Sequence, residues 1–252
     1  MHSIKRQQMI ENLIYKEKTI TISQIAEKLQ VSKPTVRNDI QKLLSNNSNI
    51  EKVHGGVSLK DDADIEFDYE KRKVKNRMKK IEIAKKIINI INEKNTILLD
   101  SSSTTYELAQ LLSQTSKRIT VITNGIQTAL QLKKNPKLFV IVLGGSLTDS
   151  SNTIKDDFGE NILNFFNIDY YFFSASGISL NRGFSEYNIH EIRTKQKHIS
   201  IANKSIALID ETKFDKDSNA NFASLEDVDL LVTNDSLPKD IYSEYKKRIT
   251  FY

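Results

Sequence analysis

The chain of 252 residues contains no cysteine, so it can form no disulfide bond and offers no thiolate as a nucleophile or metal ligand. Long hydrophobic runs are also missing, since no stretch approaches the roughly 18 uncharged apolar residues of a membrane-spanning helix. The first ten residues, MHSIKRQQMI, lack the apolar core of a secretory signal. We therefore expect a soluble, cytoplasmic protein.

Several enzyme signatures are absent as well. The sequence has no complete G-x-x-x-x-G-K-[ST] phosphate loop, no H-E-x-x-H zinc motif and no nucleophile elbow. Its four histidines show no metal-binding spacing, and we expect His190 and His198 on the surface of a helix. We therefore expect neither a metal nor a cofactor.

The excess positive charge of the chain lies in its first quarter. Residues 1–60 hold 10 Lys/Arg and 5 Asp/Glu, whereas residues 61–252 hold 27 of each, so the whole net charge of +5 belongs to the first segment. A small basic segment attached to a neutral remainder favours a polyanionic partner, although a solvated basic face would give the same count.

The segment QIAEKLQVSKPTVRNDIQKL, residues 24–43, has helical apolar spacing on both sides of VSKP. Proline is tolerated in the first turn of a helix, so Pro34 indicates that a second helix begins here. We expect Ser23 to cap the first helix and Ser32 to cap the second. Two helices joined by a tight turn, the second with a polar and basic front, form a helix-turn-helix; an ordinary helical hairpin is the alternative.

The polar front of this second helix suits phosphates and base edges in a DNA major groove. After it, IEKVHGGVSL predicts a strand, a glycine turn and a second strand, which would form a wing against the DNA backbone. The residues expected to contact DNA are Ser32, Lys33, Thr35, Arg37, Asn38 and Gln41 on the helix, and Lys52 and His54 on the wing.

This segment resembles the DNA-binding motif of the DeoR family of bacterial transcriptional regulators, V-S-x-x-T-[IV]-R-R-D followed by H-G-G. The matching residues are Val31, Ser32, Thr35, Val36, Arg37 and Asp39, with His54, Gly55 and Gly56 after them. Asn38 stands where the family has a second arginine. Because asparagine also reads base edges, we expect an altered operator preference and not a loss of binding.

An abrupt change of charge follows the wing. Residues 61–70 contain six acids and no base, and residues 71–80 contain seven bases and no acid. We interpret residues 61–80 as a charged linker between a DNA-binding domain at 1–60 and a larger domain at 81–252. The basic run could be solvated, pair with the acidic run or lie beside DNA. The family has a similar region, with a phenylalanine and an arginine resembling Phe67 and Arg72.

From residue 95 onward, short apolar runs rich in β-branched and aromatic residues alternate with amphipathic segments. The runs are NTILLD, ITVITN, LFVIVLGG, DYYFFSASG, SIALID and DLLVTN. This alternation predicts an α/β domain with a mostly parallel sheet and helices on both faces. Ligands of such sheets bind beyond the carboxyl ends of the strands, so the residues that follow each run are the candidate site.

Polar and small residues follow these runs. SSSTT opens a helix after the first run and offers hydroxyls and backbone N–H groups to an anion, whereas a simple helix cap needs only one such residue. Glycines end later runs and leave room for a ligand. Asp210 and Lys213 follow another strand, and Lys195 lies on the preceding helix. This combination suits a phosphorylated polyol, with the lysines at the phosphate and Asp100 or Asp210 at the hydroxyls.

The resemblance to the DeoR family continues through LDSSSTT, VITN, VLGGSL and LIDETKF. The C-terminal domain of that family is similar to sugar-phosphate isomerases and senses an effector. The resemblance implies an effector site of Asp100, Ser102, Ser103, Thr104, Thr105, Asn124, Gly144, Gly145, Gly177, Lys195, Asp210 and Lys213. Ser102 replaces a glycine of the family, so a need there for positive φ or a close phosphate contact would lower effector affinity.

Two functions fit these patterns. The first is a DNA-binding repressor of a sugar-metabolism operon, controlled by a phosphorylated sugar and acting as a homo-oligomer on double-stranded operator DNA, without a membrane partner. The alternative is a sugar-phosphate isomerase or related enzyme with an added nucleic-acid-binding domain. A basic N-terminal domain has no use in an isomerase, so we expect a regulator and not an enzyme.

Overall fold

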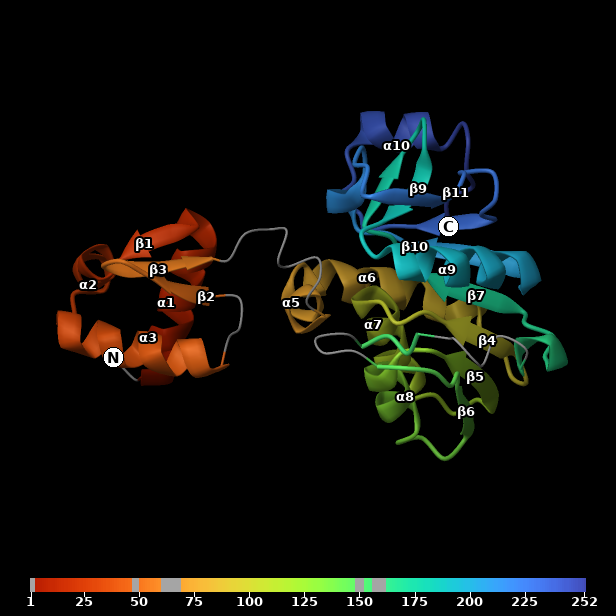
Figure 1. The fold of residues 1–252 in the computed structure, drawn as a ribbon, viewed down its shortest axis with the longest axis horizontal. Helices are drawn as coiled ribbons and strands as arrows, with labels where there is room; N and C mark the ends of the chain where they lie inside the picture. The colour runs from red at the N-terminus through yellow and green to blue at the C-terminus, as the bar shows by residue number, and fades with distance from the viewer. Residues whose placement is uncertain (1–2, 47–49, 60–68, 148–151, 156–161) are drawn as a thin grey trace. The chain divides into compact units, whose positions relative to one another are not determined.

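The computed structural model describes residues 3–46, 50–59, 69–147, 152–155 and 162–252 (Figure 1). The chain divides into two compact units, residues 1–71 and 72–252. Of the predicted linker, residues 61–68 fall outside the described residues, as does Phe67, and most of residues 69–80 lie in helices α5 (Tyr69–Val74) and α6 (Arg77–Ile87). The domain bounds read from the sequence stay a prediction.

The first unit packs helices against a small antiparallel sheet with the strand order β1-β3-β2. Its elements are α1 (Ser3–Glu17), β1 (Thr19–Thr21), α2 (Ile22–Leu29), α3 (Lys33–Asn46), β2 (Ile50–Val53) and β3 (Gly56–Leu59). The core is aliphatic, and Ile10, Ile25 and Val36 are fully buried in it. The predicted winged helix-turn-helix is confirmed; strand β1, which extends the wing to a three-stranded sheet, was not predicted.

Helix α2 begins at Ile22, and the prediction that Ser23 caps it was wrong. Thr21 is the N-cap: its side chain accepts a hydrogen bond from the Gln24 N–H at 3.2 Å, and Gln24 Oε1 accepts one from the Thr21 N–H at 2.9 Å. This reciprocal capping box satisfies two backbone donors, whereas a lone serine two residues later satisfies at most one.

The turn between the two helices is as the proline indicated. Gln30 ends α2 in the left-handed conformation, with φ of 53°. Ser32 then accepts a hydrogen bond from the Thr35 N–H at 3.3 Å and so caps α3. Pro34 lies in the first turn of α3, where no helical donor is lost.

The second unit is built on a parallel six-stranded sheet with the order β12-β10-β7-β4-β5-β6. Its strands are β4 (Thr96–Leu99), β5 (Ile119–Thr123), β6 (Leu138–Val142), β7 (Tyr170–Phe173), β10 (Lys204–Leu208) and β12 (Leu230–Val232). All six predicted runs form strands of this sheet. The chain moves outward from β4 to β6 and then returns to the other side of β4, so the topological switch point lies between β4 and β7.

Two layers cover this sheet (Figure 1). One face packs on α6, α7 (Ser103–Leu112) and α8 (Ile126–Leu132), with η1 (Ile88–Ile90) after α6. The other face packs on α9 (Ile189–Ile201), α10 (Lys239–Tyr245) and an antiparallel sheet of order β11-β9-β8, formed by β8 (Gly177–Ser179), β9 (Gly183–Glu186) and β11 (Ala220–Ala223). The short helices η2 (Ile162–Phe165) and η3 (Glu211–Lys213) complete the unit.

The antiparallel sheet was not predicted from the sequence. Among the described residues, no helix combines the length and the apolar character needed to cross a membrane.

Candidate DNA-binding and effector sites

Helix α3 and the wing present the predicted DNA-binding residues to solvent. Seven of the eight are exposed: Ser32, Lys33, Arg37, Asn38, Gln41, Lys52 and His54. Thr35 is half-buried, and its hydroxyl lies 2.8 Å from that of Ser32 at the start of the helix. The exposed set combines the donors and acceptors that read bases with cations that meet phosphates.

Asp39, although part of the same motif, faces the interior. It is 2% exposed and accepts hydrogen bonds from Arg6 Nε at 2.5 Å and from Arg6 Nη2 at 3.2 Å. This two-point contact ties α1 to α3, and Asp39 therefore fixes the orientation of the recognition helix.

The wing turn depends on its two glycines. Gly55 has φ of 78°, a conformation that disfavours other residues, and it leaves His54 exposed at the tip. A Cβ on Gly56 would lie 2.4 Å from the carbonyl oxygen of Ile20 in β1. The H-G-G sequence therefore serves the close packing of β1 and β3 as well as the turn.

In the second unit, Asp100 joins the two loops at the switch point. Its Oδ1 accepts hydrogen bonds from the Ser102 N–H at 3.0 Å and from Thr105 Oγ1 at 2.7 Å, while Oδ2 accepts one from the Ser174 N–H at 2.9 Å. The end of β4, the start of α7 and the end of β7 are thus held together by one buried carboxylate.

Ser102 fits its position without strain. Its φ is −70°, and its side chain caps α7 by accepting a hydrogen bond from the Thr105 N–H at 3.2 Å. The backbone here has no need of glycine, so one of the two reasons for expecting weakened effector affinity does not apply. Ser103, Thr104 and Thr105 follow as the buried first turn of α7.

Lys195 on α9 lies buried among carboxylates beside this junction. Its Nζ donates to Glu186 Oε2 at 2.5 Å and to the Ser174 carbonyl at 2.7 Å, and lies 3.7 Å from Asp100 Oδ2 and 3.9 Å from Glu191 Oε2. Asp100, Glu186, Glu191 and Lys195 form what we term the acidic cluster. Because three carboxylates surround one ammonium, the acidic cluster has more hydrogen-bond acceptors than donors. It can therefore accept hydrogen bonds from the hydroxyl groups of a ligand.

Burial and charge act together on this cluster. Burial alone would lower the pKa of Lys195, but the charges of Glu186, Asp100 and Glu191 outweigh it, so its pKa is raised and the ammonium stays charged. Burial raises the pKa of Glu186, yet Lys195 and the hydroxyl of Ser176 overcome this and leave it lowered. The pKa of Glu191 is raised, because burial and the neighbouring Glu186 outweigh its more distant contact with Lys195.

A second group of charges, the basic cluster, consists of Arg72, Lys80 and Lys213. Lys80 on α6 is 5% exposed; its Nζ donates to Ser103 Oγ at 2.9 Å and to the Arg72 carbonyl, and it forms no ion pair with a described carboxylate. Burial, together with the like charges of Lys213 and Arg72, lowers the pKa of Lys80 to about 8, although Asp210 opposes this.

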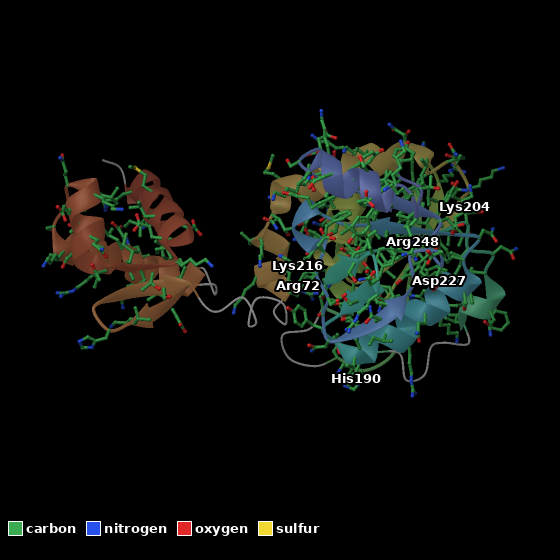
Figure 2. All side chains as sticks on the ribbon, turned by 90° about the horizontal axis from the view of Figure 1, so that it is seen from above. Arg72, His190, Lys204, Lys216, Asp227 and Arg248 are labelled. Carbon is green, nitrogen blue, oxygen red and sulfur yellow. The ribbon has the colours of Figure 1, made fainter. Side chains whose placement is uncertain are left out.

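Arg72 (Figure 2) adds an unused donor to the basic cluster. Its Nε is buried without a hydrogen-bond partner, and within the described part of the chain its guanidinium forms no hydrogen bond or ion pair. Arg72 also lowers the pKa of Glu186 and of Glu191, so its charge acts on the acidic cluster as well as on Lys80.

Asp210 borders the basic cluster and is held by protein donors. Its Oδ1 accepts hydrogen bonds from the Thr212 N–H at 3.1 Å and from Asn76 Nδ2 at 3.4 Å. Lys213 follows it in η3 and is half-buried. The structure therefore brings together eight of the predicted site residues, namely Asp100, Ser102, Ser103, Thr104, Thr105, Lys195, Asp210 and Lys213.

The remaining predicted site residues, three glycines and Asn124, follow other strands. Gly144 and Gly145 follow β6, two strands from β4, and a Cβ on Gly145 would lie 1.8 Å from the carbonyl oxygen of Lys155. Gly177 begins β8 in the smaller sheet, where a Cβ would lie 2.4 Å from the carbonyl oxygen of Lys216. Chain packing accounts for Gly145 and Gly177. Asn124 is buried at the end of β5, and its Oδ1 has no partner among the described residues.

The sequence interpretation missed Arg72, Lys80, Ser174, Glu186 and Glu191. A signal for Lys80 was present: Lys80, Ile83, Ala84 and Ile87 are spaced i, i+3, i+4 and i+7, which places the lysine on the buried face of α6. Glu191 likewise precedes Lys195 by one helical turn.

The two histidines expected on a helix surface differ. His190 is exposed at the start of α9 (Figure 2). The prediction was wrong for His198, which is 2% exposed, packs edge-on against Tyr171 with ring centroids 5.1 Å apart, and has its pKa lowered by burial to about 3. It lies one helical turn beyond Lys195, on the same buried face of α9.

The described residues contain no group of three or more His, Cys, Asp or Glu arranged to hold a metal ion.

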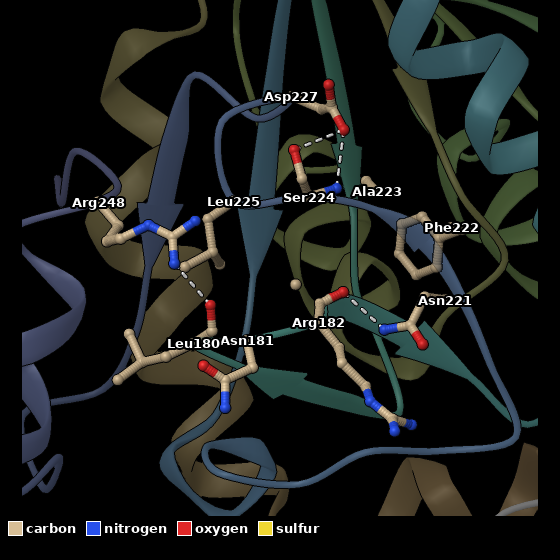
Figure 3. A pocket seen from close by; sticks show the side chains of 11 residues that line it. Leu180, Asn181, Arg182, Asn221, Phe222, Ala223, Ser224, Leu225, Asp227 and Arg248 are labelled. Carbon is tan, nitrogen blue, oxygen red and sulfur yellow. Dashed lines mark hydrogen bonds between the residues drawn. The ribbon is translucent and has the colours of Figure 1, made fainter.

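A hollow of about 300 Å³ lies on the smaller sheet, and none of the residues that line it belongs to either cluster (Figure 3). Its charged walls are already paired: Arg248 donates to the Leu180 carbonyl at 2.7 Å and to Glu226, and Arg182 lies 3.9 Å from Asp217. The candidate effector site is therefore assigned to the two clusters at the ends of the parallel strands.

Comparison with known proteins gives matches over both units. The model described as the DeoR-like helix-turn-helix domain matches residues 6–63, and that described as the DeoR C terminal sensor domain matches residues 75–235. The HTH-type transcriptional regulator GolR of Listeria innocua serovar 6a is 35% identical over 246 residues, 98% of this chain and 96% of that protein.

Two further relatives carry names that refer to the regulation of an operon. The putative aga operon transcriptional repressor of Escherichia coli O157:H7 is 26% identical over 97% of this chain and 91% of its own. The L-fucose operon activator of Haemophilus influenzae is 27% identical over 94% of each chain. Among solved structures, ribose 5-phosphate isomerase A from Methanocaldococcus jannaschii aligns over 55% of each chain with 14% identity and a TM-score of 0.42.

Proposed function

Because this chain belongs to the DeoR family of transcriptional regulators, we propose that it represses a sugar-metabolism operon and that a phosphorylated sugar controls its binding to operator DNA. The names of the aga operon repressor and the L-fucose operon activator support a sugar operon as the target. The first unit would bind DNA through α3 and the wing, and the second would bind the effector.

The observation that carries the proposal is the adjacency of two clusters of opposite character at the switch point. Lys80 donates a hydrogen bond to Ser103 in the first turn of α7. Thr105, in the same turn, donates a hydrogen bond to Asp100, and Asp100 lies 3.7 Å from Lys195. An anion at the basic cluster would meet three cations and the N–H groups of α7. Hydroxyls attached to that anion would reach the carboxylates of the acidic cluster. A polyol carrying one phosphate has both halves of this pattern.

The buried contacts of the acidic cluster favour a sensor over an enzyme. Lys195 and Asp100 already bond to protein partners on several sides, so they are poorly placed to exchange protons with a substrate. We infer a regulator without catalytic activity. Turnover of pentose or hexose phosphates by the isolated protein would contradict this.

The test is a fluorescence-anisotropy titration of labelled operator DNA from the chain's own promoter, in the presence of candidate sugar phosphates. We expect wild-type protein to bind DNA in a salt-sensitive manner and to change its affinity with one phosphorylated sugar but not with the unphosphorylated sugar. Lys213→Ala should remove the response and keep operator affinity. A mutant that responds at the same effector concentrations as wild type would remove Lys213 from the site.

A second variant examines Ser102, one of the positions at which this chain departs from the family's motifs. Ser102→Gly removes the helix cap but gives a phosphate closer access to the backbone. A gain in effector affinity would show that Ser102 limits binding, whereas a loss would show that the cap at Thr105 is more important.

We also propose that the protein acts as a homo-oligomer, because helix-turn-helix regulators usually read repeated half-sites.

A further inference from the structure

The two edges of the six-stranded sheet differ in whether another described segment pairs with them. At the β12 edge, the Leu231 N–H donates to the Thr250 carbonyl at 2.8 Å, and the Tyr252 N–H donates to the Leu231 carbonyl at 3.1 Å. Residues 250–252 thus pair with β12 and cover its main chain. At the other edge, β6 pairs with β5 on one side and with no described residue on the other (Figure 1).

Strand β6 also lacks the features by which edge strands usually avoid association. Its sequence, LFVIV, contains no charge and no proline, and it pairs with β5 over all five residues without a bulge. Phe139 is 66% exposed and Val142 is 44% exposed, on opposite faces of the strand. A second strand can pair with an open main-chain edge, because it supplies alternating donors and acceptors at the matching spacing.

We propose that β6 pairs antiparallel with β6 of a second copy of this chain, centred on Val140, so that two six-stranded sheets become continuous. In this register Phe139 faces Ile141 of the second copy, and Val142 faces Leu138 of the second copy. Each exposed apolar side chain therefore gains a cross-strand neighbour. An aromatic residue opposite a β-branched one is a favourable pair of this kind.

Charge supports the antiparallel arrangement. β6 has no charged side chain to repel its copy, whereas Lys133, Lys134 and Lys137 precede it. Antiparallel pairing places the lysines of the two copies at opposite ends of the joined strands, and parallel pairing would bring them together. A two-fold pair also matches the need of a helix-turn-helix regulator for two DNA-binding units.

Disulfide formation at the centre of the strand is the direct test. The chain has no cysteine, so Val140→Cys introduces its only thiol. Residues facing each other in antiparallel strands have Cα atoms about 4.5–5.5 Å apart, within the range of a disulfide. Under mild oxidation of the full-length protein we expect a crosslinked dimer from Val140→Cys. The matched control is Tyr252→Cys, a 54% exposed residue at the covered edge, which should stay uncrosslinked. Equal crosslinking of the two variants would overturn the proposal.

Sedimentation velocity gives an independent measurement. Wild-type protein should sediment as a dimer at micromolar concentration, and Phe139→Lys as a monomer. Leu130→Lys, which places the same charge on a 44% exposed leucine of α8, should remain dimeric. Unchanged thermal unfolding of Phe139→Lys separates lost pairing from misfolding. A monomeric wild type, or a dimeric Phe139→Lys, would refute pairing through β6. Effector response is measured separately on DNA, so its failure would contradict the proposed function and not this surface.

Discussion

The charged residues expected to contact DNA are exposed on the surface of the first unit, whereas the charged residues of the candidate effector site are buried inside the second unit. Arg37 is exposed on α3 and has no ion-pair partner among the described residues. Lys195 is 4% exposed and touches three carboxylates. A surface that reads a long polyanion can change residue by residue without a folding penalty, but a buried site for a small ligand is also part of the core. Substitutions should therefore separate binding from stability in the first unit and couple them in the second.

The largest effect is expected from Lys195→Met. Removing the ammonium leaves Asp100, Glu186 and Glu191 buried without their counter-charge, and breaking a buried ion pair costs about 3–5 kcal/mol. Chemical denaturation followed by circular dichroism measures this loss. Arg193→Met, an exposed position on the same helix, serves as the control and should change stability by less than about 0.5 kcal/mol. Adding Glu186→Gln to Lys195→Met should recover part of the loss. Equal stability of the two single variants would show that the acidic cluster is not a structural unit.

Lys80→Met should weaken effector binding and leave operator affinity unchanged. A hydrogen bond from a charged donor contributes about 1.5–3 kcal/mol, so effector affinity should fall ~10- to 100-fold. Lys85→Met, an exposed lysine on the same helix, is the matched control. The readout is the effector concentration that half-releases labelled DNA. The same half-point for Lys80→Met and Lys85→Met would remove Lys80 from the site.

Arg37→Ala should weaken operator binding without altering stability. If Arg37 reads a base, the loss is about 1–3 kcal/mol and is confined to the native operator; if it meets a phosphate, the loss is similar on every sequence. Anisotropy with operator and scrambled DNA distinguishes these outcomes. Undiminished affinity for the operator would exclude α3 as the recognition helix, and a lowered melting temperature would contradict the contrast between the units.

Effector affinity should also fall as pH rises through the pKa of Lys80, which burial has lowered to about 8. Phosphate binding needs the charged ammonium, so affinity should drop about tenfold between pH 7 and pH 9. Stability has the opposite sign: between about pH 8 and 10.5 the unfolded chain holds this proton and the folded chain does not, so the contribution of Lys80 to stability rises with pH. Lys80→Met should show neither trend, and a flat wild-type profile would contradict the assignment.

The smallest effect is expected at the wing. Lys52→Ala should lower the slope of log affinity against log salt by about 1 and should weaken operator and scrambled DNA alike. Glu51→Ala, its exposed neighbour in β2, removes a charge of opposite sign and should not reduce the slope. A Lys52→Ala slope equal to that of wild type would place the wing away from the phosphates.

Some parts of this fold are visible in the sequence because one local pattern determines them. The parallel strands other than β6 are largely buried on both faces, so each appears as a continuous apolar run. The cap of α2 was assigned to the wrong residue, although Thr21 and Gln24 form a capping box within four residues. The smaller sheet is different. Its strands GIS, GFSE and ANFA are short, and they contain glycine or polar residues. Pairing between distant segments stabilises them, and no local pattern shows that pairing.

The same limit applies to the candidate effector site. Strand ends and hydroxyl-rich turns pointed to Asp100, Ser103 and Lys213, because sheet topology alone brings strand ends to one edge. Glu186 could not be found in this way, since it reaches Lys195 only through the antiparallel sheet that the sequence does not reveal. Lys80 could have been found from its helical spacing, but the run of seven bases around it suggested a solvated linker.

The C-terminal segment at β12 has a consequence for how large an assembly can become. A sheet with one open edge can join one other sheet, and the pair is then complete. A sheet with two open edges can add partners at both sides and grow into a filament. If two copies join through β6 as proposed, residues 250–252, which pair with β12, would restrict association through the sheet to a single closed pair and so limit polymerisation.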